Sequence, residues 1–150
     1  MIQFNIQWSK ALLSELDREI YAHFFAVVRG QKIVYIGNAN GETLRTLLES
    51  TLASPDFHGG KTEIYLGRIR EYGTRRIPSE TIEGLHQLLV YARKPRLNRR
   101  GKLRYNGLAN LRVTNSGCEL LPYNVRAENR IVFLSMKNAA KMRYQPGIAG

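Results

Sequence analysis

The residues of this sequence best suited to chemistry at a phosphate are Tyr35, Arg45, Glu83 and Asn98. A lone carboxylate such as Glu83 can hold Mg²⁺ or Mn²⁺, because such ions accept oxygen ligands and keep much of their hydration. The planar guanidinium of Arg45 can bind a phosphate and stabilise the charge that builds in the transition state. Tyr35 could position or deprotonate an attacking water, provided that its surroundings lowered its pKa. Together, these residue types are suited to metal-assisted cleavage of a phosphodiester bond.

The same four residues also have structural interpretations. Glu83 could be an ordinary helix-surface carboxylate, and Arg45 could be a solvated helix arginine. Tyr35 could be a core tyrosine whose hydroxyl is hydrogen-bonded, and Asn98 could be a turn residue after a helix. The residue types leave both interpretations open, so the choice depends on where the chain places them.

Two histidines are further candidates for this chemistry. His23 lies two residues before Phe25, on the same face of an expected strand, and a neutral imidazole is a suitable base near pH 7. A half-buried strand histidine is the structural alternative. His86 follows Glu83 by three residues and shares its side of an expected helix. A single Glu-x-x-His pair is weak evidence for a metal site, and a surface histidine is the favoured interpretation.

The elements that must position these residues can be inferred from hydrophobic periodicity. Alternation predicts strands over residues 2–8, 22–29, 32–37 and 62–70, with Gly30-Gln31 as a two-residue hairpin turn. Helical spacing predicts helices over residues 10–20 and 42–52 and from Pro78-Ser79 to about Lys94, where Pro95 ends the helix. Shorter strand-like runs cover residues 111–114, 119–121 and 130–134. This order predicts an α+β fold with a small, mainly antiparallel sheet and helices packed against one of its faces.

Charge divides the sequence into two unequal parts. Residues 1–83 hold 10 basic and 10 acidic side chains, whereas residues 84–150 hold 13 basic and 2 acidic ones. The formal net charge of +11 therefore lies entirely in the second part. Such an excess favours a polyanionic partner, because binding to phosphates releases counterions. The densest segment comprises Arg93, Lys94, Arg96, Arg99, Arg100, Lys102 and Arg104.

The motifs and their order resemble the GIY-YIG nuclease superfamily. Tyr35-Ile36-Gly37 matches the second half of the name, and Arg45 follows at the spacing of the family's helix arginine. Residues 82–89 are similar to its glutamate helix, and Lys94-Pro95-Arg96-Leu97-Asn98 is similar to its Lys-Pro-x-x-Asn ending. The resemblance implies a DNA endonuclease in which Glu83 holds Mg²⁺ or Mn²⁺ and Asn98 fixes the site by side-chain hydrogen bonds. The basic segment would grip the DNA backbone.

One position departs from the family pattern. Where the family carries its first tyrosine, this chain has Phe25, which cannot accept a proton. His23 is the nearest candidate to replace that tyrosine as general base. Two alternatives stay open: a catalytically degenerate GIY-YIG-like module that binds nucleic acid without cleaving it, and a basic RNA-binding protein. The sequence leaves the oligomeric state open, a dimer included.

The resemblance covers residues 22–100 and suggests three segments. Residues 1–21 would be an N-terminal strand and helix extension, residues 22–100 the nuclease-like core, and residues 101–150 a basic, β-rich extension packed on or beside it. The sequence shows no signal peptide and no stretch of membrane-spanning length, and its single cysteine, Cys118, suits a reducing compartment. We therefore expect a cytoplasmic protein without a membrane partner.

Overall fold

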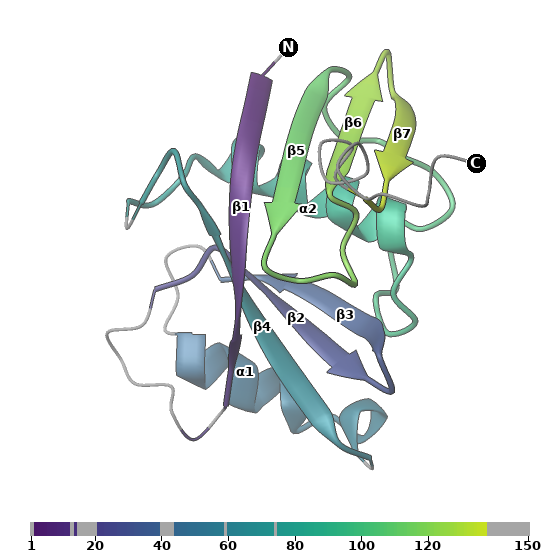
Figure 1. Cartoon of the computed structure of the whole chain (residues 1–150). Helices are drawn as coiled ribbons and strands as arrows, with labels where there is room; N and C mark the ends of the chain where they lie inside the picture. The colour runs from purple at the N-terminus through teal and green to yellow at the C-terminus, as the bar shows by residue number, and fades with distance from the viewer. Residues whose placement is uncertain are drawn as a thin grey trace, which may run out of the picture.

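The computed structural model describes residues 2–12, 14, 21–39, 44–58, 60–73 and 75–137. It is an α+β fold with a curled, mainly antiparallel sheet of seven strands and two α-helices (Figure 1). The strands are β1 (Ile2–Ala11), β2 (Phe24–Arg29), β3 (Lys32–Asn38), β4 (Thr62–Ile69), β5 (Leu111–Ser116), β6 (Asn124–Glu128) and β7 (Ile131–Ser135). The helices are α1 (Leu44–Leu52) and α2 (Ser79–Arg93), and a 3₁₀ turn covers Pro55–Phe57.

Strand β1 lies at the centre of the sheet. The strand order is β3-β2-β4-β1-β5-β6-β7, and every pairing is antiparallel except that of β1 with β5 (Figure 1). Strand β1 therefore joins the β4–β2–β3 group to the three C-terminal strands. The segments suggested by the sequence contribute strands to one continuous sheet, so the boundaries at residues 21/22 and 100/101 do not separate structural units.

The two helices lie on opposite faces of the sheet, which corrects the expectation of helices against one face. Alternate residues of β2 belong to different clusters: Phe24, Ala26 and Val28 pack with α2, whereas Phe25 and Val27 pack with α1. The α2 face carries the larger cluster, which also takes in buried residues of β1, β5 and β6. Helix α1 contributes Leu44 and Leu48 to the smaller cluster. On the face that α1 covers, the part formed by β5, β6 and β7 carries no described residue of either cluster.

The hairpin, the third strand beside it and both α-helices are confirmed. Strands β2 and β3 form the expected hairpin, and its turn residues Gly30 and Gln31 both have positive φ angles of 54° and 61°. A turn with two such residues matches the twist of the flanking strands. Strand β4 pairs with β2 as the third strand, and α1 and α2 begin and end close to their expected limits. Lys94 ends α2 in the left-handed conformation, one residue before Pro95.

Three expectations about secondary structure are wrong. Residues 10 and 11 belong to β1, because Lys10 and Ala11 pair with Tyr65 and Ile64 of β4. The rest of the helix expected over residues 10–20 falls largely on residues 13 and 15–20, which lie outside the described residues. Residues 119–121 form a turn and not a strand, and strand β6 was not expected.

Within the described ranges, no helix is long and apolar enough to cross a membrane.

Candidate functional site

An open cleft of about 460 Å³ lies between one side of α2 and the loop that follows it. Glu83 and His86 are exposed to the cleft from α2, and Arg100 and Arg104 line it from the loop. The remaining lining residues are Asn38, Gln87, Val90, Gly101, Tyr105 and Asn106. The cleft therefore combines one carboxylate, one imidazole and two guanidinium groups.

Glu83 is the single carboxylate of the cleft. It is exposed, and no other described residue forms a hydrogen bond or an ion pair with it. The described part of the chain has no group of three or more His, Cys, Asp or Glu side chains that could enclose a metal ion. A closed zinc-type site is therefore not formed there. A hard ion such as Mg²⁺ or Mn²⁺, which keeps several water ligands, is the type that one carboxylate with amide oxygens nearby can hold.

His86 has one nitrogen fixed and the other free. Its Nε2–H donates to the backbone carbonyl of Ile36 over 2.8 Å, so the neutral ring leaves Nδ1 without a proton. Within the described residues, no hydrogen bond is made to Nδ1. Burial lowers the pKa of His86 from its ordinary value, although the Ile36 hydrogen bond and the charge of Glu83 act in the opposite direction. The imidazole is half-buried and not the surface residue that its sequence context favoured, and at neutral pH it is an available base.

Asn98 attaches the loop to the free edge of β3. Its side-chain Oδ1 accepts from Ile36 N–H over 2.9 Å, and its Nδ2–H donates to the Ile36 carbonyl over 2.8 Å. One residue earlier, Leu97 N–H donates to the Val34 carbonyl. The side chain thus supplies the donor and acceptor that a neighbouring strand would supply. These are hydrogen bonds of the kind that the resemblance implied, and the Ile36 carbonyl that Asn98 shares with His86 ties the loop to the cleft.

The structure divides the seven basic residues between Arg93 and Arg104 into three groups. Lys94 and Lys102 are used within the loop, since Lys94 Nζ donates to the Lys102 carbonyl and Lys102 Nζ to the Arg96 carbonyl. Lys94 Nζ also lies 3.8 Å from the centre of the Tyr91 ring. In contrast, Arg99 forms only a long, exposed contact with Asp56, and Arg93 donates to Met136 Sδ. Arg96, Arg100 and Arg104 are the members of this set of seven that form no side-chain hydrogen bond or ion pair with another described residue.

Tyr35 lies outside this cleft, on the face of the sheet that α1 covers. Its ring packs against Phe25 and Phe57, with centroid distances of 5.8 Å and 5.5 Å. Burial raises the pKa of Tyr35, whereas a tyrosine base needs a lowered one. The expectation that Tyr35 takes the proton from water is therefore not supported by its surroundings.

Arg45 also does not line the cleft. It is exposed on α1, where its Nε lies 3.0 Å from Glu49 Oε1, one helical turn away. Exposed pairs of this type contribute about 0.3–0.5 kcal/mol, so a ligand could displace Glu49 at little cost. Because α1 and α2 pack on opposite faces, Arg45 is not brought to Glu83 by the packing of the helices.

His23 has a structural role, which corrects its prediction as general base. Its side chain is fully buried, and both ring nitrogens are engaged with the backbone. Nδ1 accepts from Ile69 N–H over 3.0 Å, and Nε2 lies 3.1 Å from the Arg75 carbonyl, to which it donates. Burial lowers the pKa of His23, so the ring is neutral at pH 7. It cannot accept a proton without leaving Ile69 N–H without a partner.

Phe25 fills the position of the missing tyrosine completely. It is 1% exposed and pairs across the hairpin with Gly37. A Cβ at Gly37 would lie 2.3 Å from the Phe25 Cζ atom, so the ring occupies the space of a side chain at that position. Gly37 is therefore required by the packing of Phe25, whose ring is buried in the core on the α1 side.

We expect Phe25→Tyr to destabilise the protein without creating a base. The added hydroxyl overpacks a filled core position, which typically costs about 1–3 kcal/mol of the free energy of unfolding. Urea unfolding measures this loss, and a plasmid-nicking assay measures activity. A variant that was as stable as the wild type and cleaved DNA faster would show that the tyrosine position is still part of a catalytic site.

The structure thus brings together only part of the predicted constellation. Glu83 lies in the cleft, and Asn98 fixes the adjoining loop and strand, whereas Tyr35, Arg45 and His23 do not line it. The spacing of Glu83 and His86 was the signal for the pair. Asn38, Tyr105 and Asn106 were not predicted as lining residues, and their types alone carry no such signal. The Tyr105 hydroxyl donates to the Leu108 carbonyl over 2.6 Å, and burial raises its pKa to about 12. Tyr105 therefore lines the cleft as an uncharged side chain.

No protein-family model, curated protein or solved structure matches the chain.

Proposed function

We propose that this protein is a nucleic-acid-cleaving enzyme of the GIY-YIG type, which hydrolyses phosphodiester bonds of DNA in the cleft on α2. The observation that carries this proposal is that Glu83 and His86 share one cleft with Arg100 and Arg104. The order of motifs along the chain and the hairpin followed by α1, β4 and α2 support it. The basic character of the second part of the sequence supports DNA as the partner.

The loop residues bind the substrate in this proposal. Arg100 and Arg104 face the cleft, so their guanidinium groups can each contact a backbone phosphate. Arg96 extends the same cationic loop. Phosphate contacts position the DNA without reading its sequence. Asn98 and His86 both donate a hydrogen bond to the Ile36 carbonyl. These two bonds hold the loop that carries Arg100 and Arg104 in position beside α2.

Glu83 and His86 carry the chemistry in this proposal. The carboxylate of Glu83 would hold Mg²⁺ or Mn²⁺, and Asn38 lines the same cleft. The chemistry supplied at Glu83 by a bound ion would be polarisation of the scissile phosphate and stabilisation of the charge on the leaving oxygen. The free Nδ1 of His86 takes a proton from the attacking water, since its Nε2–H is held by Ile36 and keeps the ring in the required tautomer. His86 would then do what the family resemblance assigned to a tyrosine.

Binding without cleavage is a second candidate function. It is favoured by Phe25 at the tyrosine position and by the buried, aromatic surroundings of Tyr35. In this case the cleft and the arginines of the loop would form a phosphate-binding surface alone. The two candidates differ in whether bound DNA is cut when a divalent ion is present.

Plasmid nicking and DNA binding, measured on the same preparation, test the proposal. We expect supercoiled plasmid to be nicked in Mg²⁺ or Mn²⁺, and the nicking to stop in EDTA while binding persists. Salt-sensitive binding with no turnover in either ion would establish the second candidate instead. A protein that neither bound nor cut DNA at low salt would contradict both.

The pH dependence identifies the base. Because the pKa of His86 is lowered below 6.5, the imidazole is already neutral at pH 7. The rate should therefore increase as the pH rises through the acidic range with a midpoint below pH 6.5, and it should show no further increase around pH 10, where a tyrosine would ionise. His86→Gln should remove the acidic limb. A rate that kept rising towards pH 10 would assign the proton transfer to another group.

A further inference from the structure

The open face of the C-terminal strands carries a row of side chains that the cleft does not use. Arg112 of β5 pairs with Arg126 of β6, and Arg126 pairs in turn with Phe133 of β7. The three side chains point away from α2, since their strand neighbours Val113 and Val125 belong to the core on the α2 side. Directly paired residues on one face lie about 5 Å apart. The row is therefore a continuous patch of two guanidinium groups and one aromatic ring.

The two arginines of the row line a shallow pocket of about 320 Å³. Its lining residues are Arg112, Tyr123, Asn124, Arg126, Leu134, Ser135 and Lys137. Three of them are cationic, and the buried Nε of Arg112 has no hydrogen-bond partner among the described residues. Placing two arginines directly opposite each other is unfavourable unless an anion lies between or above them. The charge pattern therefore fits an anionic ligand.

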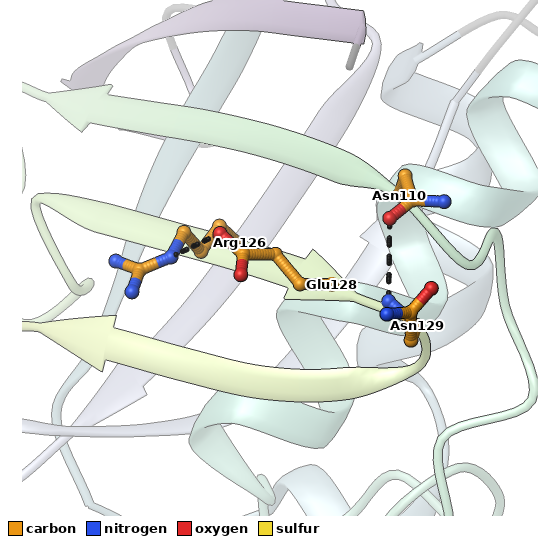
Figure 2. Close-up of polar contacts among 4 residues, drawn as sticks. All are labelled: Asn110, Arg126, Glu128 and Asn129. Atoms are coloured by element: carbon orange, nitrogen blue, oxygen red, sulfur yellow. Dashed lines mark hydrogen bonds and ion pairs between the residues drawn. The ribbon is translucent and has the colours of Figure 1, made fainter.

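One carboxylate partly offsets this charge. Glu128 Oε1 accepts from Arg126 Nε over 3.0 Å, and Figure 2 shows the two side chains side by side on β6. The bond uses Nε, and the terminal nitrogens of Arg126 extend away from Glu128 along the sheet. Glu128 thus orients the guanidinium and leaves its outer edge available. The pocket itself has no acidic lining residue within the described part of the chain.

Phe133 adds a stacking surface to these cations. It is 42% exposed on the edge strand, and the Arg126 Cζ lies 4.7 Å from the centre of its ring. An aromatic ring and a guanidinium plane both accept a stacked nucleobase. An acidic peptide without aromatic side chains would use the cations but not the planar platform. The combination favours a ligand that carries phosphates and unstacked bases together.

We infer that the open face of β5, β6 and β7 is a second binding site, for single-stranded DNA. A base stacks on the Arg126–Phe133 platform, and the neighbouring phosphates bind Arg112 and Lys137. Duplex DNA fits less well, because its bases are already stacked within the helix. The choice of DNA over RNA rests on the proposed function. The site itself does not, because its residues are distinct from those of the α2 cleft.

Fluorescence anisotropy with a labelled thymine oligonucleotide tests this inference in EDTA, where no cleavage occurs. We expect Phe133→Ala to weaken binding about tenfold, the usual loss for one stacked base. Arg126→Gln should also weaken binding. It should reduce the slope of log affinity against log salt concentration by the equivalent of about one phosphate contact. Ile131→Ala is the matched control, since Ile131 is 60% exposed on the same strand and face but pairs with Glu128. This control should bind like the wild type.

Two comparisons separate this site from the cleft. Arg104→Gln, in the cleft, should reduce oligonucleotide binding less than Phe133→Ala does, whereas Phe133→Ala should leave plasmid nicking detectable. Duplex DNA of the same length should bind more weakly than the single strand and be insensitive to Phe133→Ala. Unchanged binding by Phe133→Ala, an equal loss in Ile131→Ala, or tighter binding of RNA of the same length would overturn the inference. Circular dichroism and thermal unfolding of each variant exclude misfolding as the cause.

Discussion

Glu83→Gln is expected to slow plasmid nicking about a hundredfold while leaving the fold and the DNA affinity unchanged. Glu83 is exposed and makes no contact with the described residues that the substitution could break. The amide keeps the size of the side chain but loses the charge that would hold a divalent ion. Losing about 3 kcal/mol of charge stabilisation in the transition state corresponds to about a hundredfold in rate.

The best control for this experiment is Glu80→Gln. Glu80 is also exposed, lies one turn earlier on α2 and does not line the cleft. It should nick plasmid at the wild-type rate. Equal rates for wild type and Glu83→Gln would show that any cleavage came from a contaminant or from another site.

A second readout distinguishes a chemical role from a structural one. The negative charge of Glu83 raises the pKa of His86. Removing the charge should therefore lower the pKa of His86 further in the metal-free protein, which NMR titration of its imidazole in EDTA measures. A substitution that disturbed the packing of α2 would instead also shift the signals of residues remote from the cleft.

The parts of the fold that could be predicted from the sequence are those with local signals. The hairpin follows from two apolar, β-branched runs around Gly30-Gln31, whose positive φ angles the tight turn requires. Helix α2 follows from its apolar spacing and from Pro95, which prevents continuation beyond Lys94. The position of Glu83 and His86 on the same side of α2 follows from the same helical spacing.

The arrangement of the sheet depends on contacts that no local pattern specifies. Strand β1 pairs in parallel with β5, more than a hundred residues later, and this pairing places the N-terminus at the centre of the sheet. The same long-range pairing with β4 holds Lys10 and Ala11 in a strand, although the following residues have helical spacing. Strand β6 has only Val125 and Ala127 as buried residues, too short an alternation to identify.

The separation of Tyr35 from Glu83 has a physical cause in β3. The register between β2 and β3 shifts between Val27 and Val28, so that Tyr35 pairs with Val27 and shares the face that α1 covers. Helix α2 and Glu83 belong to the opposite face. The sequence shows that Tyr35, Arg45 and Glu83 follow one another in the expected order. The face of the sheet on which each residue lies depends instead on the β-bulge and on the packing of the two helices.

Asn98→Asp is expected to have the largest effect on stability, about 3 kcal/mol of the free energy of unfolding at pH 7. Asn98 is 7% exposed, and its amide makes two hydrogen bonds to Ile36. A carboxylate can still accept from Ile36 N–H, but its second oxygen then faces the Ile36 carbonyl instead of donating to it. An unsatisfied buried polar group costs about 1–3 kcal/mol, and a charged one costs more.

The pH dependence of this loss follows from the sign of the pKa change. Burial beside a carbonyl favours the protonated form of the introduced carboxyl, so its pKa in the folded protein is raised above the value of about 4 in the unfolded chain. The folded state then binds more protons than the unfolded state, and the stability of the variant relative to wild type increases as the pH falls from 7 towards 4. Urea unfolding at several pH values measures this. Asn98→Ala, which has no carboxyl, should lose about 2 kcal/mol at all of them.

The same variant connects stability to the cleft. Asn98 and His86 both donate to the Ile36 carbonyl, so a carboxylate at position 98 leaves His86 as the only remaining donor to it. The loop that carries Arg100 and Arg104 would lose its register with α2, and nicking should fall even under conditions where the variant is folded. Asn106→Ala serves as the control, because Asn106 is exposed in the same loop and should change stability by less than about 0.5 kcal/mol. A stable Asn98→Asp variant with full activity would show that β3 and the loop are held together without this asparagine.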